Sequence, residues 1–211
     1  MSAGYDHWAA INRNWNEFIW GDGKKYKLGL GDEKNRYIPT HLPLFGEKAV
    51  MLVLAEWHTL ILTQRGRVYS FGNGYYGRLG HGNEENVETP KLIKAIAQIQ
   101  IVHIAINQTH SMLVSKDGKV YAFGSYGDGR CGFDTGMNNI SIPTMIKLPS
   151  SMIIIAAECG QMHSVLLSSN GQTLSCGSYN NNGHGKTFYE PTAIQTLQNE
   201  NIKSIATGWY H

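Results

Sequence analysis

Cysteine is scarce in this sequence, and the few cysteines follow no recognisable spacing. There are three, Cys131, Cys159 and Cys176, an odd number without a Cys-x-x-Cys pair. Such a set indicates neither a disulfide framework nor a zinc-binding knuckle. We therefore expect reduced thiols and a cytoplasmic or nuclear protein. Delivery into a host cell as an effector stays open as a third alternative.

Long apolar runs and a strong net charge are missing as well. The longest apolar run, Ala49 to Ala55, is much shorter than the roughly 20 residues that a membrane-spanning helix needs. Residues 1–8 show no basic segment followed by an apolar core, so no signal peptide is expected. The formal net charge of +2 gives no direct signal for nucleic acid or a membrane surface.

Signatures of catalysis are absent too. The carboxylates Asp128 and Glu158 stand alone, and no serine or cysteine has a histidine and a carboxylate at a recognisable spacing. A reaction site needs such groups in mutual reach. We expect neither an enzyme nor a bound cofactor or metal ion.

What the sequence does contain is a repeat with a period slightly above 50 residues. Four histidines stand 51, 52 and 53 residues apart, and a glycine follows each of them 14 residues later. The histidines are His7, His58, His110 and His163, the glycines Gly21, Gly72, Gly124 and Gly177, and the prolines that follow are Pro39, Pro90, Pro143 and Pro191. A fixed period of this order is typical of solenoids, propellers and arrays.

Each unit is predicted to hold four short strands. Runs of five or six apolar residues, rich in β-branched side chains, precede the histidines, and these favour strand over helix. Asp117-Gly118 and Asn170-Gly171 predict two-residue type I′ hairpins, whereas Trp15 at the glycine position predicts a looser or different turn in the first unit. The apolar spacing from Leu92 to Ile106 would suit a helix, but its counterparts are short and bounded by turns, so we expect strands.

These observations predict an all-β fold, a β-propeller of four-stranded antiparallel blades with about four blades present. A single repeat domain would cover 1–211, with blades at about 1–49, 50–100, 101–152 and 153–201. Residues 202–211 would start a further blade or close the ring, in which case 202–206 would supply the strand that the first unit lacks. Open sheet edges would favour association with a partner chain.

The second unit is the clearest copy of the repeat. It reads Glu56-Trp57-His58-Thr59, then Arg-Gly-Arg-Val-Tyr-Ser-Phe-Gly over 65–72, then Gly-Arg-Leu-Gly over 77–80 and Pro90. In this pattern the chain resembles the regulator of chromosome condensation repeat family over nearly its whole length. The fourth unit departs from it, with Asn-Gly-His-Gly over 182–185. The resemblance implies a seven-bladed ring of which this chain is a part, and it is more specific for fold than for function.

Two features invite a chemical interpretation that the context does not favour. Residues 72–77 match the Gly-x-Gly-x-x-Gly dinucleotide fingerprint, but Arg-Leu-Gly-His-Gly follows, which cannot begin the helix that holds a pyrophosphate. Histidines that occur once per blade would be spread around the ring and would not converge on one metal ion. We expect them to tie the turns together by hydrogen bonds.

The candidate site is the set of glycine-rich loops, because loops on one face of a rigid scaffold commonly carry function. Their aromatic and charged residues are candidate protein contacts, with packing between blades as the alternative for the tyrosines. These residues are Tyr75, Tyr76, Arg78, Tyr126, Asp128, Arg130 and Tyr179.

The resemblance implies a protein-binding regulator of a small GTPase of the Ran type, with guanine-nucleotide exchange factor activity. The exchange factor of the family uses a protruding wedge, and no unit of this chain has an insertion long enough to form one. The alternative is therefore a structural scaffold in a larger assembly, without exchange activity.

Overall fold

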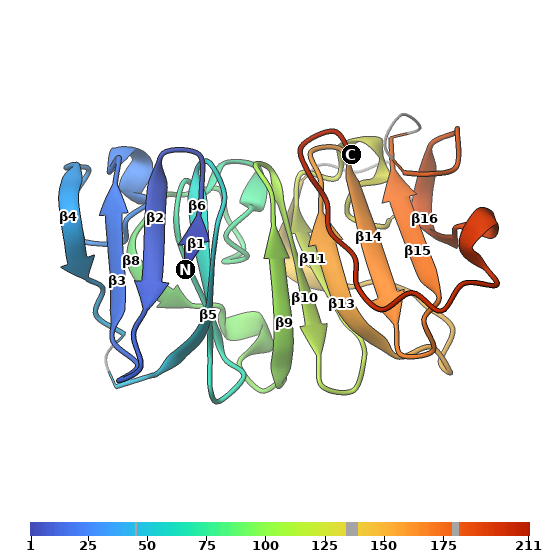
Figure 1. Ribbon diagram of the computed structural model, residues 1–211. Helices are drawn as coiled ribbons and strands as arrows, with labels where there is room; N and C mark the ends of the chain where they lie inside the picture. Colours follow the sequence, from blue (N-terminus) through green and yellow to red (C-terminus); the bar gives the residue numbers. More distant parts are fainter. Residues whose placement is uncertain (45, 134–138, 179–181) are drawn as a thin grey trace.

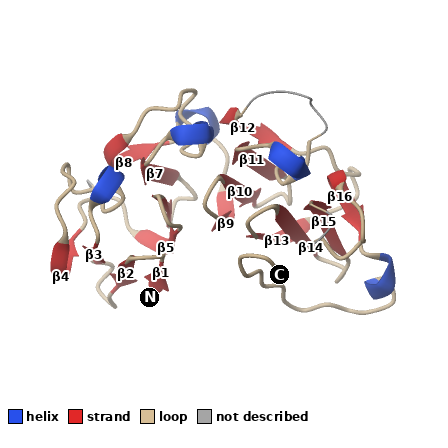
Figure 2. Cartoon of the chain, turned by 90° about the horizontal axis from the view of Figure 1, so that it is seen from above, coloured by secondary structure: helices blue, strands red, loops and turns tan. Residues whose placement is uncertain are grey.

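The structure, a computed structural model, describes residues 1–44, 46–133, 139–178 and 182–211. It contains four antiparallel sheets of four strands, and in each sheet the strands are neighbours in chain order. The sheets stand side by side in an arc (Figure 1), and the view from above in Figure 2 shows the fourth strand of each sheet on the outside. The predicted all-β architecture of four-stranded antiparallel blades is confirmed.

The blades are bounded as follows. Blade 1 holds β1 (Ser2–Ala3), β2 (His7–Ile11), β3 (Glu17–Gly21) and β4 (Arg36–His41). Blade 2 holds β5 (Ala49–Leu54), β6 (His58–Thr63), β7 (Val68–Gly72) and β8 (Val87–Leu92). Blade 3 holds β9 (Ile101–Ile106), β10 (His110–Ser115), β11 (Val120–Gly124) and β12 (Ile140–Met145). Blade 4 holds β13 (Ile154–Cys159), β14 (His163–Ser168), β15 (Thr173–Gly177) and β16 (Phe188–Ala193).

The few helices are single 3₁₀ turns. They are η1 (Lys24–Tyr26), η2 (Tyr75–Gly77), η3 (Lys94–Ile96), η4 (Gly127–Gly129) and η5 (Gln195–Leu197). The segment Leu92 to Ile106 therefore contains the end of β8, the turn η3 and β9, and the strand prediction there holds. No helix in the described part of the chain has the length and apolarity to cross a bilayer.

Three apolar clusters lie between successive blades. Leu28 and Phe71 belong to the cluster between blades 1 and 2, and Phe123 to the one between blades 2 and 3. Between blades 3 and 4, Cys131 and Cys176 occupy the positions that Leu28 and Phe71 have in the first cluster. Successive blades thus bury the faces that they turn toward each other, as a stack of sheets must.

All three thiols are free and buried in the cluster between blades 3 and 4. Burial raises the pKa of the Cys176 thiol to about 12 and that of Cys159 well above its usual range. Buried, protonated thiols are poor nucleophiles and poor metal ligands. These cysteines therefore fill the core as small apolar side chains.

The hairpin turns differ from the predicted type I′. Only the glycine has a positive φ in each, +74° at Gly66, +78° at Gly118 and +81° at Gly171. The Gly118 N–H donates to Ser115 O, and Ser115 N–H donates to Lys119 O. This is a three-residue loop, in which a type I turn is followed by a left-handed residue. The type I′ prediction was wrong, because this turn needs a positive φ at both central residues and neither Asp117 nor Asn170 has one.

The first blade makes the same turn, although it has no glycine there. Trp15 has a φ of +64°, its N–H donates to Asn12 O, and Asn12 N–H donates to Asn16 O. The Asn12 side chain also accepts hydrogen bonds from the Asn14 and Asn16 N–H groups. The prediction of a looser or different turn was wrong, since these bonds hold the tryptophan in the left-handed region.

The first unit also has the strand that the sequence seemed to lack. Ser2 and Ala3 pair antiparallel with β2, Ser2 opposite Ala9 and Ala3 opposite Trp8. Residues 202–206 form no strand and do not pair with β2. The position at the inner edge of blade 1 is filled by β1, so closure of the sheet by 202–206 is not observed.

A proline lies inside the fourth strand of every blade. Pro39 is in β4, Pro90 in β8, Pro143 in β12 and Pro191 in β16. These are the outermost strands, and proline is tolerated on such an edge because its missing N–H would otherwise face outward. The edges of the blades are thereby protected against pairing with other strands.

We expect Trp15→Gly to raise the free energy of unfolding by about 0.5–1 kcal/mol. A left-handed conformation costs a residue with a Cβ roughly 1–2 kcal/mol, and glycine removes this cost. The greater conformational freedom of glycine in the unfolded chain offsets only part of that gain in stability. Urea denaturation would measure the change. Gly118→Ala is the matched control and should destabilise, because its Cβ would lie 2.8 Å from Ile153 Cα. A loss of stability in Trp15→Gly would show that indole packing outweighs the strain.

Candidate protein-binding face

The repeated histidines join each blade to the next one. His58 Nε2 lies 3.2 Å from the Ser111 hydroxyl of blade 3, and this hydroxyl donates to Arg78 O at 3.1 Å. The same arrangement recurs from blade 1 to blade 2 and from blade 3 to blade 4. Its members are His7 with Thr59 and Lys27 O, and His110 with Ser164 and Arg130 O.

The hydrogen bonds decide the tautomer of these histidines. Each hydroxyl donates its one proton to a carbonyl, so it must accept from the histidine, and Nε2 carries the hydrogen. The Nδ1 atoms of His7, His58 and His110 are then acceptors, and they are buried without a hydrogen-bond partner, the one of His7 lying 3.7 Å from the Asp6 carboxylate. Burial lowers the pKa of His7 to about 4 and that of His110 to about 3. The rings are neutral in the folded protein.

The 14-residue spacing has a direct structural reason. Each histidine lies opposite its glycine across the second hairpin of the blade: His7 with Gly21, His58 with Gly72, His110 with Gly124 and His163 with Gly177. At Gly72 the φ is +108°, and a Cβ would lie 2.6 Å from Trp57 O. The chain therefore turns into the loop at a point where no larger residue fits.

Two residues that sequence reasoning placed among the partner contacts are buried. Arg78 is 3% exposed and donates to Tyr75 O at 2.6 Å and to Gln108 O of blade 3 at 2.7 Å. Arg130 is 7% exposed and donates to Gly127 O at 2.7 Å and to Gln161 O of blade 4 at 3.1 Å. Both guanidinium groups hold a loop to its own blade and to the next.

Blade 1 uses Lys27 at this position, which sequence reasoning missed. Its ammonium is buried, lies 2.5 Å from Asp6 and 2.7 Å from Asp22, and sits over the Trp57 ring of blade 2. A lysine donates from one atom, so it needs these two nearby carboxylates where an arginine reaches two carbonyls. The repeat position, six residues after each of Gly21, Gly72 and Gly124, was the available signal.

The residues at the loop tips are held in a left-handed conformation. Tyr76 has a φ of +63° and Asp128 a φ of +60°, and Lys25 in blade 1 has +58°. The Tyr76 ring lies over the Arg78 guanidinium, and Asp128 pairs with Arg130 at 3.1 Å. Glycine would fit this backbone better, so each tip carries a side chain at some cost in stability.

The other candidates are placed as follows. Tyr75 is 54% exposed and packs on Tyr76 with ring centroids 4.2 Å apart. Tyr126 is half-buried and precedes η4. Tyr179 lies outside the described residues. The structure thus brings Tyr75 and Tyr76 together in one loop and puts Tyr126 and Asp128 in the next.

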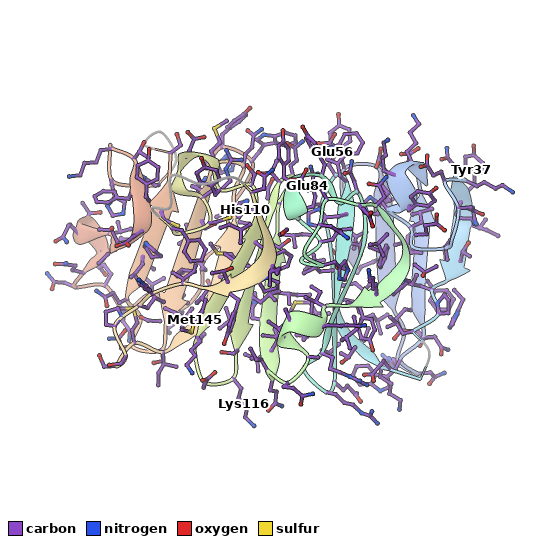
Figure 3. All side chains as sticks on the ribbon, turned by 180° about the vertical axis from the view of Figure 1, so that it is seen from behind. Tyr37, Glu56, Glu84, His110, Lys116 and Met145 are labelled. Atoms are coloured by element: carbon purple, nitrogen blue, oxygen red, sulfur yellow. The ribbon has the colours of Figure 1, made fainter. Side chains whose placement is uncertain are left out.

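In blades 2 and 3 the loop end and the opposite end differ in charge. Figure 3 shows Glu56 and Glu84 at the end of the loops and Lys116 at the opposite end, where the hairpin turns lie. At the loop end of blades 2 and 3, the exposed charged side chains among the described residues are all acidic: Glu84, Glu85, Glu88 and Asp128. The arginines of these loops are buried, so blades 2 and 3 present negative charge at the loop end, whereas blade 1 exposes Lys24 and Lys25 there.

Glycines 72, 74 and 77 have packing reasons that explain the resemblance to a dinucleotide fingerprint. A Cβ at Gly77 would lie 2.6 Å from Ser141 Cα of blade 3. The residues that follow form the three-residue turn η2 and no α-helix. The described residues also contain no group of three or more histidine, cysteine or carboxylate side chains able to hold a metal ion.

Comparison with known proteins identifies the repeat. The sequence pattern of the regulator of chromosome condensation (RCC1) repeat matches residues 18–62, 65–114 and 117–167, which is more than half of the chain. The chain belongs to the RCC1 repeat family. The resemblance read from the sequence is confirmed, and with it the repeat unit described above.

The RCC1 relatives are varied. The chain is 28% identical over 178 residues to the Arabidopsis thaliana ultraviolet-B receptor UVR8, covering 84% of this chain and 40% of the receptor. It is 29% identical over 215 residues to the mouse E3 ubiquitin-protein ligase HERC2, covering 99% of this chain and 4% of the ligase. The chain thus spans less than half of the length of these relatives.

Among solved structures, yeast RCC1 (Prp20) bound to Kap60 has the same fold. The TM-score is 0.81 at 23% sequence identity, and the match covers 97% of this chain and 50% of that chain. The arc of four blades corresponds to half of the length of that protein.

Acid should destabilise the RCC1 fold well above the pH at which carboxylates titrate. The pKa values of His7, His58 and His110 are lowered by burial, so the unfolded chain takes up these protons first as the pH falls below about 6.5. The contribution of these histidines to the free energy of unfolding is fully present above that pH and is lost as the pH falls toward 4. We expect a loss on the order of 1 kcal/mol per histidine between pH 7 and pH 5, measured by urea denaturation. His58→Gln should flatten the slope, and an unchanged slope would contradict the assignment.

Arg130→Met should lower the free energy of unfolding by about 3 kcal/mol, because it leaves the carbonyls of Gly127 and Gln161 buried without a donor. Thermal or urea denaturation would measure this loss. The matched control is Arg65→Met in a hairpin turn, where the side chain is 74% exposed and the change should stay within about 0.5 kcal/mol. Equal effects at the two positions would refute the role of Arg130 between blades.

Proposed function

We propose that this chain is a non-enzymatic protein-binding propeller whose loop end engages a small GTPase of the Ran type and promotes the exchange of its guanine nucleotide. Membership in the RCC1 family supports a protein partner, as does the solved structure of yeast RCC1 (Prp20), to which Kap60 is bound. The choice of a small GTPase as the partner is supported by the resemblance of these repeats to those of the exchange factor of the family.

The observation that carries the proposal is the construction of the loop tips in blades 2 and 3. Buried arginines fix each loop to two blades, and the tips present Tyr75, Tyr76 and Asp128. Two of these residues keep a side chain in a left-handed conformation that glycine would adopt at lower cost. Such local strain is found where a side chain is used for recognition.

Exchange on this surface would need no bond chemistry. A protein that binds the nucleotide-free GTPase more tightly than the loaded form lowers the affinity of the GTPase for its nucleotide by the same factor. Rigid loops suit this task because little entropy is lost when they bind. The acidic loops of blades 2 and 3 would approach a basic region of the partner.

The alternative is a scaffold that docks in a larger assembly without exchange activity. The regularity of the blades favours it, since no loop of the described residues is long enough to protrude as a wedge. The similarity to HERC2, in which the matched part is 4% of the protein, also shows this repeat within a much larger chain. For either function we propose a reducing compartment, the cytoplasm or the nucleus, supported by three buried free thiols.

The test is the release of a fluorescent guanine nucleotide from a panel of purified small GTPases. We expect the chain to accelerate release from a Ran-type GTPase, and Tyr75→Ala and Asp128→Asn to reduce the acceleration roughly ten-fold each, as for central interface residues. Asparagine tolerates the left-handed backbone, so Asp128→Asn removes only the charge.

Tyr37→Ala is the control, because Tyr37 is 90% exposed on the outer strand β4 and its loss should leave release unchanged. Acceleration that survives both loop substitutions would place the contact elsewhere on the propeller. No acceleration with any GTPase would leave the scaffold as the function.

A further inference from the structure

The turn before each histidine places one side chain at the inner rim of the loop end. In every unit the residue three positions before the histidine donates its N–H to the histidine carbonyl, as Gly4 does to His7 at 2.9 Å and Asn107 to His110 at 3.0 Å. The side chains two positions before the histidines are equivalent. They are Tyr5, Glu56, Gln108, Gln161 and Trp209.

Trp209 joins this set although it lies in no strand. Gly208 N–H donates to His211 O at 2.5 Å, which repeats the turn of the four blades. The Trp209 carbonyl accepts from Gln161 N–H of blade 4 at 2.8 Å. Figure 2 shows this last segment returning to the concave side of the arc, near β13.

A cavity of about 260 Å³ lies at this rim, and four of the five side chains line it. Its apolar part is formed by Leu54 and Ile106, the last residues of β5 and β9. Tyr5, Trp209, Glu56 and Gln108 also line it. Tyr5 is 71% exposed and Trp209 39%, so both rings are accessible to an incoming group.

The Glu56 carboxylate is only partly used by the protein. Gln108 Nε2 donates to its Oε2 atom, and among the described residues Oε1 has no hydrogen-bond partner. The Arg78 guanidinium is near, but its Nε and Nη1 atoms donate to the carbonyls of Tyr75 and Gln108 and it makes no ion pair with Glu56 within 4 Å. A carboxylate offers about four acceptor positions, so Glu56 can accept from a further donor.

We propose that this rim cavity binds the cationic side chain of a lysine or arginine presented by a protein partner. The aliphatic stem of such a side chain fits against Leu54 and Ile106, and its charged end reaches Glu56. Tyr and Trp rings attract a cation through their faces. The negative loop end of blades 2 and 3 would draw a basic surface toward the cavity. The identity of the partner rests on the proposed protein-binding function, but the cavity itself can be tested without the partner.

The experiment is a titration of the ¹⁵N-labelled chain with N-acetyl-lysine methylamide and with N-acetyl-arginine methylamide. Chemical shifts of the Trp209 indole and of the Gln108 amide report on the cavity. We expect saturable shifts, with at least about five-fold weaker binding of the uncharged norleucine and citrulline derivatives. The Trp209 indole signal is assigned by its loss in Trp209→Leu, which should also weaken both charged probes.

Glu56→Gln is the sharpest variant, because the amide oxygen can still accept from Gln108 and only the charge is lost. It should weaken the lysine probe about five-fold and leave the norleucine probe unchanged, whereas Tyr37→Ala should change neither. Equal binding of the lysine and norleucine probes, or no saturable shift with either charged probe, would overturn the proposal. A positive titration with no nucleotide release would refute the exchange function alone, and the reverse result would refute the cavity alone.

Discussion

Each blade is fastened to the next by a hydrogen-bond chain of imidazole, hydroxyl and backbone carbonyl, and the rest of the structure depends on it. This hydrogen-bond chain is buried, and its groups come from two blades, so it is complete only when both blades are in place. Buried polar groups stabilise a structure when they are paired and are costly when one partner is missing. These hydrogen bonds therefore set the relative position of the blades, while the apolar clusters provide most of the driving force for the contact between blades.

The loops of the candidate face are held rigid by the same buried region between the blades. In two of the three hydrogen-bond chains the final carbonyl belongs to Arg78 or Arg130, whose side chain then reaches the following blade, and in the chain from blade 1 to blade 2 it belongs to Lys27. One residue thus links the buried base of the loop to the interface between blades. Side chains at the loop tips can occupy an unfavourable backbone conformation because the base beneath them is fixed at two points.

Much of the fold could be predicted from the sequence, since histidine, glycine and proline recur at positions that the backbone dictates. The spacing of His58 and Gly72 is a cross-strand pair, and a pair of this kind leaves a regular trace. The burial of Arg78 and Arg130 could not be predicted, because charged residues in loops are usually solvated. At Trp15 the prediction failed for a different reason, because local hydrogen bonds hold this residue in a left-handed conformation that a tryptophan does not favour. The rim cavity was invisible because residues from separate repeats form it together.

The fastening between blades has a direction, because one blade supplies the imidazole and the following blade supplies the hydroxyl. Blades 2, 3 and 4 therefore each carry a hydroxyl on one flank and an imidazole on the other, whereas blade 1 has Trp8 where the others have the hydroxyl residue. A unit duplicated or removed as a whole would leave both kinds of flank matched, so arrays of different length can be assembled from the same part. The curvature of the stack then decides whether the last blade of such an array comes back to the first.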